Sequence, residues 1–225
     1  MSTTTSKPSE QSSIELFKSE IKKMAKDNLL KHLEGREFNI EKIKVWGEMI
    51  LNDLGNDLKK KYPEFGFGLF FYISDLTNYI SNNNSIYYVK TDLTIMEAYN
   101  TNHYYSEIRV FANKKYSTKE NFNKNMSSKD IMNINKRFHD SLEGRTYKEN
   151  LVVKYCENIV NDINNILLER ANNRPCSFQI CFINKLPIKN IYTDFKFIDL
   201  EYMPFFFSYS NDSLSSNLFL FVVNN

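Results

Sequence analysis

Two closely similar six-residue segments occur in this chain of 225 residues, and this repeat constrains the fold more than any other feature. Residues 33–38 read Leu-Glu-Gly-Arg-Glu-Phe and residues 142–147 read Leu-Glu-Gly-Arg-Thr-Tyr, an offset of 142 − 33 = 109 positions. The same register continues without a gap, and its matching pairs include Ile43 and Val152, Trp46 and Tyr155, Glu48 and Glu157, and Leu58 and Leu167. A period near half the chain length indicates two copies of one unit. Two copies on one chain can form the pair that identical subunits form in a homodimer.

The composition permits a sizeable core and argues against several classes of partner. Hydrophobic residues make up 42% of the chain and aromatic residues 15%, while the net charge is only +2. Because no long basic block occurs, neither nucleic acid nor an acidic membrane surface is an expected partner. The apolar runs are far shorter than the ~18 residues of a membrane span. Residues 1–13 are polar, lack the apolar centre of a signal peptide and are predicted to form a disordered tail.

The first copy is predicted to span residues 14–112 and to begin with two amphipathic helices. Apolar residues three or four positions apart indicate one helix from Ile14 to about Gly35 and a second from about Ile40 to Tyr62. The second helix carries Ile43, Trp46, Ile50, Leu54 and Leu58. Four strand-like stretches follow, at residues 67–73, 86–89, 93–99 and 105–112. The polar segment 113–129 is interpreted as a linker.

The second copy, residues 130–225, repeats this order. Its expected helices cover residues 131–142 and 152–166, and its expected strands cover residues 178–183, 191–198, 202–209 and 218–223. Strands that follow helices without alternation are typical of antiparallel sheets with helices packed on one face. The predicted fold class is therefore α+β, with two tandem α-α-β-β-β-β modules. We expect them to fold against each other as a pseudo-two-fold intramolecular dimer, so that the chain is a monomer.

The order of the elements and the pattern of glycine, aromatic and apolar residues in each copy resemble the Tctex-type dynein light chain family. In the first copy the residues that carry the resemblance are Gly35 with Phe38, Trp46, the strand 67–73, Tyr87 and Tyr88 with Asp92, and the strand 108–111. In the second copy they are Gly144 with Tyr147, Tyr155 in place of the Trp, and the segments 178–183, 195–199 and 218–223. The second copy departs from the pattern in this Tyr and in a shorter region between its second and third strands. Both departures allow the copies to bind different partners.

The resemblance implies that the two modules exchange their second strands and that a partner peptide adds along the edge of an exchanged strand. In this family the peptide typically comes from a dynein intermediate chain. A strand edge offers unpaired N–H and C=O groups, so an extended peptide gains main-chain hydrogen bonds there. The expected partner-binding residues are Ser85, Ile86, Tyr87, Tyr88 and Val89 in the first copy, and Ile191, Tyr192, Phe195 and Phe197 in the second. For Tyr87 and Tyr88, burial in the core and contact with a partner remain equal alternatives.

The residues that could carry catalysis or bind a metal have simpler structural interpretations. Cys156, Cys176 and Cys181 include no CxxC pair, are odd in number and read as buried thiols in a reducing compartment. The histidines, His32, His103 and His139, occupy non-equivalent positions and are expected at the surface or at caps. Glu48 with Asp53, and Glu157 with Asp162, lie five positions apart and therefore on different helix faces. We expect no catalytic, cofactor-binding or metal-binding residue.

The sequence therefore predicts a non-catalytic dynein light chain that binds intermediate-chain or adaptor peptides by strand addition and supports motor assembly or docking. Its expected partners are a dynein intermediate chain and other dynein light chains. The expected location is the cytoplasm and cytoskeleton, including the cilium and its axoneme. The alternative is a peptide-binding adaptor with the same fold that works independently of dynein.

Overall fold

A computed structural model describes residues 10–75, 85–90, 93–114, 127–170, 176–184, 191–198 and 205–222. The helices in these ranges are α1 (Glu10–Leu33), α2 (Ile40–Lys61), α3 (Ser128–Leu142) and α4 (Glu149–Arg170). The strands are β1 (Phe65–Asp75), β2 (Ser85–Lys90), β3 (Leu93–Asn100), β4 (Tyr104–Lys114), β5 (Cys176–Asn184), β6 (Ile191–Ile198), β7 (Phe205–Ser210) and β8 (Leu214–Val222). The order α-α-β-β-β-β occurs twice, and the predicted α+β class is confirmed.

Several predicted boundaries are wrong by a few residues. Helix α1 begins at Glu10, so residues 10–13 belong to a helix and not to a disordered tail. The expected linker is shorter at both ends, because β4 runs to Lys114 and α3 begins at Ser128. Polar residues such as Glu, Gln and Ser extend a helix without leaving an apolar signal, which is why periodicity missed these ends. Residues 1–9, residues 115–126 and Asp92 lie outside the described residues.

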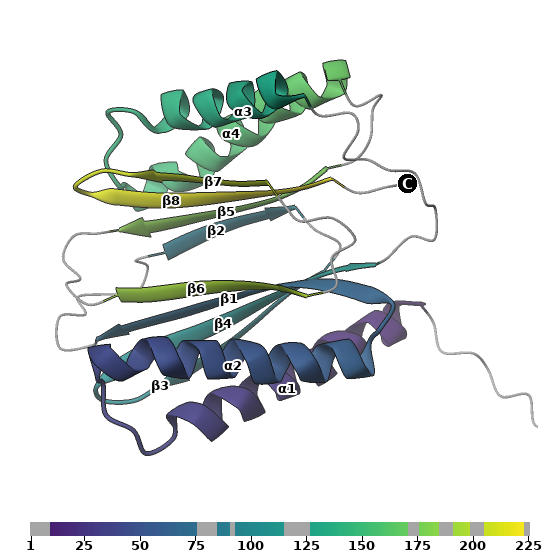
Figure 1. Ribbon diagram of the computed structural model, residues 1–225, viewed down its shortest axis with the longest axis vertical. Coiled ribbons are helices and arrows are strands. Elements are labelled where there is room, and N and C mark those ends of the chain that lie inside the picture. The colour runs from purple at the N-terminus through teal and green to yellow at the C-terminus, as the bar shows by residue number, and fades with distance from the viewer. Residues whose placement is uncertain are drawn as a thin grey trace, which may run out of the picture.

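The helices and sheets form four layers. Helices α1 and α2 cover the outer face of one sheet, α3 and α4 cover the outer face of the other, and the two sheets face each other between them (Figure 1). Sheet A has the strand order β3-β4-β1-β6, and sheet B has the order β2-β5-β8-β7. All of the pairings are antiparallel.

Each sheet contains one strand from the other half of the chain. Strand β6 pairs with β1 from Phe67↔Ile198 to Ser74↔Ile191, and β2 pairs with β5 from Ser85↔Ile183 to Lys90↔Phe178. The halves are therefore joined by two main-chain ladders. These ladders place β6 at one end of sheet A and β2 at one end of sheet B.

One hydrophobic core lies between each sheet and the helices that cover it. A third, smaller cluster lies on the inner face of sheet A. Alternate residues of β1 point to opposite faces, as the pleat of a strand requires. Phe67, Leu69, Phe71 and Ile73 pack with α1 and α2. Phe70 and Tyr72 pack with Phe111 on the face toward sheet B. Because β1 is buried on both faces, its sequence is a continuous apolar run.

Candidate functional site

The candidate site is the outer edge of the exchanged strands. Strand β6 ends the order of sheet A and β2 ends the order of sheet B, and the described residues supply no strand beyond either one. An end strand pairs along one side only, and its other side presents main-chain groups to which an extended peptide can bond. The geometry can therefore bind a peptide as an added strand.

The structure distributes the predicted site residues between these two ends. Ser85, Ile86, Tyr87, Tyr88 and Val89 lie on β2, whereas Ile191, Tyr192, Phe195 and Phe197 lie on β6. They belong to different sheets and do not form one continuous site. The side chains of β2 and of Ile191 lie outside the described residues, so the orientation predicted for Tyr87 and Tyr88 stays a prediction. Tyr192, Phe195 and Phe197 are half-buried.

Two glycines of α2 allow β6 to pack closely against this helix. A Cβ atom at Gly47 would lie 2.6 Å from Cε1 of Tyr192, and a Cβ atom at Gly55 would overlap Cδ1 of Ile198. The glycines are 55 − 47 = 8 positions apart, close to two turns of helix, so both face the same strand. Neither glycine was predicted as part of the site, although an isolated Gly inside a helical pattern is a signal of close packing.

One polar contact lies within β6 and another joins β6 to α2. The Tyr192 hydroxyl donates to Oδ2 of Asp194 at 3.0 Å, and Lys196 donates to Oδ1 of Asn52. Burial raises the pKa of the Tyr192 phenol well above its usual value, and the carboxylates of Asp194 and Glu48 raise it further. The phenol therefore stays protonated and keeps its role as a donor.

Asp194 also occupies the edge of β6. The backbone N–H of Phe195 donates to Oδ1 of Asp194 at 2.8 Å. The Thr101 N–H donates to the Tyr104 carbonyl, and the alternation that follows from the strand registers turns the Phe195 N–H away from β1, toward the outer edge. A charged side chain that covers a main-chain donor is one of the ways in which edge strands avoid uncontrolled pairing. An added strand has to displace this carboxylate.

The inner face of β6 is held by aromatic packing. The Phe195 ring lies with its centroid 4.7 Å from Phe70 of β1 and 6.4 Å from Phe206 of β7. These contacts and those of Tyr192 with α2 anchor both faces of the strand. A partner at this edge therefore meets mainly the main chain, and the predicted site side chains chiefly hold the strand in place.

The second exchanged strand meets a different helix surface. The repeat offset aligns Gly47 with residue 47 + 109 = 156 and Gly55 with residue 55 + 109 = 164, which are Cys156 and Asn164 of α4. Cys156 has no exposed surface, which confirms the structural interpretation of this thiol. The side chains of Cys176 and Cys181 lie outside the described residues. Helix α4 therefore lacks the two glycines that lie against β6 on α2.

The repeated six-residue segment forms the turn between the two helices of each half. Gly35 and Gly144 have φ values of +71° and +69°, the left-handed conformation in which a helix commonly ends at glycine. The Arg that follows stacks on the equivalent aromatic ring in both halves. The guanidinium of Arg36 lies 5.0 Å from the Trp46 centroid, and that of Arg145 lies 5.4 Å from the Tyr155 centroid.

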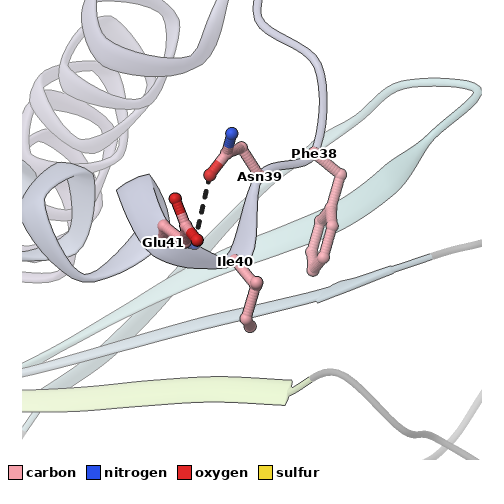
Figure 2. A pocket seen from close by; sticks show the side chains of 4 residues that line it. All are labelled: Phe38, Asn39, Ile40 and Glu41. Carbon is pink, nitrogen blue, oxygen red and sulfur yellow. Dashed lines mark hydrogen bonds between the residues drawn. The ribbon is translucent and has the colours of Figure 1, made fainter.

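A shallow cavity of about 410 Å³ adjoins the first of these turns and is lined by Phe38, Asn39, Ile40 and Glu41 (Figure 2). Asn39 caps helix α2, because its Oδ1 accepts hydrogen bonds from the backbone N–H groups of Glu41 and Lys42, both at 3.1 Å. The Asn39 side chain in this cavity is thus used in capping the helix. Trp46 beside it is only 6% exposed, in agreement with its predicted role in the core.

The prediction that all three histidines lie at the surface or at caps is wrong for His32. This side chain is 3% exposed, and its Nε2 lies 2.9 Å from Oδ2 of Asp53. The same carboxylate accepts a hydrogen bond from Lys31 at 2.6 Å, and Lys31 and then His32 lower the pKa of Asp53. The packing of α1 on α2 creates this contact across 53 − 32 = 21 positions, which helical spacing does not encode. His103 and His139 are exposed, as expected.

In the part of the chain that the structure describes, the candidate acid pairs and metal ligands do not converge. Glu48, Glu157 and Asp162 are exposed, and Asp53 pairs with α1. Among the described residues, no group of three or more His, Cys, Asp or Glu side chains could hold a metal ion. No helix in the described part of the chain has the length and apolar character that crossing a bilayer requires.

Comparison with known proteins gave no match, either among protein-family models or among curated proteins. The functional interpretation therefore depends on the edge geometry described above and on the family resemblance of the sequence.

Proposed function

We propose that the chain is a non-catalytic dynein light chain in which two tandem Tctex-like modules form a pseudo-two-fold intramolecular dimer. It binds intermediate-chain or adaptor peptides as strands added to its exchanged edges and supports motor assembly or docking, in the cytoplasm or at the axoneme. The observation that carries the proposal is the cross-pairing of β6 with β1 and of β2 with β5. This is the strand exchange that the family resemblance implies.

A single chain with both modules needs no second copy. The tether keeps the second module at a high effective concentration, so the exchange is intramolecular. We expect the purified chain to sediment as a monomer at micromolar concentration. An obligate dimer would contradict the proposed intramolecular pair.

The difference between the two helices bears on the alternative function, a peptide-binding adaptor that works independently of dynein. Gly47 and Gly55 bring α2 close to β6, whereas Cys156 and Asn164 stand at the aligned positions of α4. Two unlike edges suit an adaptor that joins two different partners, with or without dynein. Capture from lysates of ciliated or dividing cells separates the two functions, because only a motor subunit brings dynein heavy and intermediate chains with it.

Phe195→Pro tests strand addition at β6. Proline removes the N–H that donates to Asp194, and so it takes away one of the main-chain donors that an added strand could use. Phe195→Ala is the matched control, since it also loses the aromatic ring but keeps the N–H. We expect the alanine variant to capture dynein intermediate chain and the proline variant to lose it.

Folding has to be verified for both variants by circular dichroism. A folded proline variant with unchanged capture would refute strand addition at β6. An independent measurement avoids the substitution: bound partner should slow amide hydrogen exchange in residues 191–198 of the unmodified chain. Protection confined to the helices would place binding on their surface and count against the proposal.

A further inference from the structure

The face of β7 that points toward sheet A is open to solvent. Phe206 is 52% exposed and Ser208 and Ser210 are also exposed, whereas Phe207 between them is 6% exposed and packs under the helices. Among the described residues, Phe206 is the only aromatic residue in the set of exposed large hydrophobic side chains. Its position next to the candidate edge makes it relevant to binding.

Phe206 continues an aromatic row that begins inside the molecule. The row runs from Phe70 of β1 to Phe195 of β6 with 4.7 Å between ring centroids, and then to Phe206 with 6.4 Å. The first ring is 1% exposed, Phe195 is half-buried and Phe206 is 52% exposed, so the row opens outward. The exposed patch is thus continuous with the contact that joins the two sheets.

A strand added at β6 extends sheet A on the side of this contact. Neighbouring strands lie about 4.8 Å apart, and side chains at paired positions stand beside one another on the same face. The peptide residue paired with Phe195 therefore points toward β7. Its side chain reaches the exposed part of Phe206, and the next residue on that face lies two positions along the peptide.

We propose that β6 selects an extended peptide with one bulky apolar residue, Leu, Ile, Met or Phe, which pairs with Phe195 and packs on Phe206. This inference rests on strand addition at β6, the proposed function of this edge. The occupant is a peptide segment of a protein partner, since main-chain pairing holds the strand and Phe206 discriminates a single side chain. Exposed serines on the same face of β7 restrict the apolar preference to that position.

The test begins with a random decapeptide library selected on the full chain. A fluorescein-labelled synthetic peptide from the selection is then compared with its version in which the enriched apolar residue is alanine. Fluorescence anisotropy should give a dissociation constant about tenfold weaker for the alanine peptide, the effect of removing one buried apolar side chain. The two peptides are then measured against three variants of the chain.

The first variant, Phe206→Ser, should bind both peptides with nearly equal affinity, because the apolar contact is lost. Phe206→Leu should preserve most of the discrimination. Met96→Ser is the matched control. Met96 is also exposed, at 47%, but it lies on β3, at the end of sheet A opposite β6. This variant should leave the tenfold difference unchanged.

The outcomes separate this inference from the proposed function. If peptide binding requires the Phe195 N–H, by comparison of Phe195→Pro with Phe195→Ala, but discrimination survives in Phe206→Ser, the role of Phe206 is refuted and strand addition stands. If binding is indifferent to that N–H, or if the library yields no binding peptide, strand addition at β6 fails and the inference fails with it. The proposal is supported if Phe206→Ser loses the difference in affinity between the two peptides while Phe206→Leu and Met96→Ser keep it.

Discussion

Substitution of Gly47 by alanine tests how closely β6 packs against α2. In an exposed helix this change stabilises by about 1 kcal/mol, since alanine is the better helix former. Here the new Cβ would lie 2.6 Å from Cε1 of Tyr192 and 3.1 Å from Cδ1 of Phe71. Both atoms belong to rigid rings in a packed core, and overpacking of this kind costs about 1–3 kcal/mol. We therefore expect Gly47→Ala to lower the free energy of unfolding by up to about 2 kcal/mol, the difference between these two effects.

Gly55→Ala is the matched comparison on the same helix. It gains the same helix propensity, but its nearest neighbour is Cδ1 of Ile198, the far end of a flexible side chain that can rotate away. Its net effect should be close to zero. Urea denaturation followed by the fluorescence of Trp46, the only tryptophan, measures both variants.

A double-mutant cycle identifies the cause of the loss. In a Tyr192→Ala background the Cβ atom at residue 47 has space, so Gly47→Ala should cost less than in the unmodified chain, or even stabilise. If Gly47→Ala stabilises the unmodified chain by about 1 kcal/mol, as in an exposed helix, the close approach of α2 and β6 is refuted.

Three further predictions concern the core, the α1–α2 contact and the edge. Trp46→Ala should lower the free energy of unfolding by about 3–5 kcal/mol in urea denaturation, because it empties a buried site; a loss below 1 kcal/mol would contradict its core role. Lys31 and His32 lower the pKa of Asp53, so its contribution is present above the unfolded pKa of about 3.9 and is lost as pH falls through the folded value. The stability difference between the chain and Asp53→Asn should thus shrink from pH 7 to pH 3 in thermal unfolding; a constant difference would exclude this ionic contact. Asp194→Ala frees the Phe195 N–H and should tighten peptide binding about 2–10-fold by anisotropy, the effect of one hydrogen bond, whereas weaker binding would assign Asp194 to peptide contact.

Parts of the candidate site could be predicted and parts could not. Residues 191–198 were assigned to a strand with the bounds that β6 has, because β-branched and aromatic residues mark it. The start of β8 at Leu214 was missed, since Ser215, Ser216 and Asn217 follow and give no apolar signal. The exposed Phe206 lay within a predicted strand, but alternation alone does not state which face of a strand is covered.

The sequence by itself determined the order of the elements and the repeat. Helical spacing of three and four, the change to period two and the turn at Gly35 are local properties that depend on neighbouring residues. It also determined that β1 is buried. A continuous apolar run is typical of a strand that is covered on both faces.

Only the tertiary structure decided the register of the strand pairs, whereas the exchange of the second strands was expected from the family resemblance and not from the strand residues themselves. A strand of period two presents its main-chain groups in the same way to any neighbour, so the choice of β1 as the partner of β6 depends on surfaces far apart in sequence. The close approach of β6 to Gly47 and Gly55, the pairing of His32 with Asp53 and the aromatic row to Phe206 arise from that same long-range packing. They appear only when the chain is folded, because each joins residues from elements that the sequence separates.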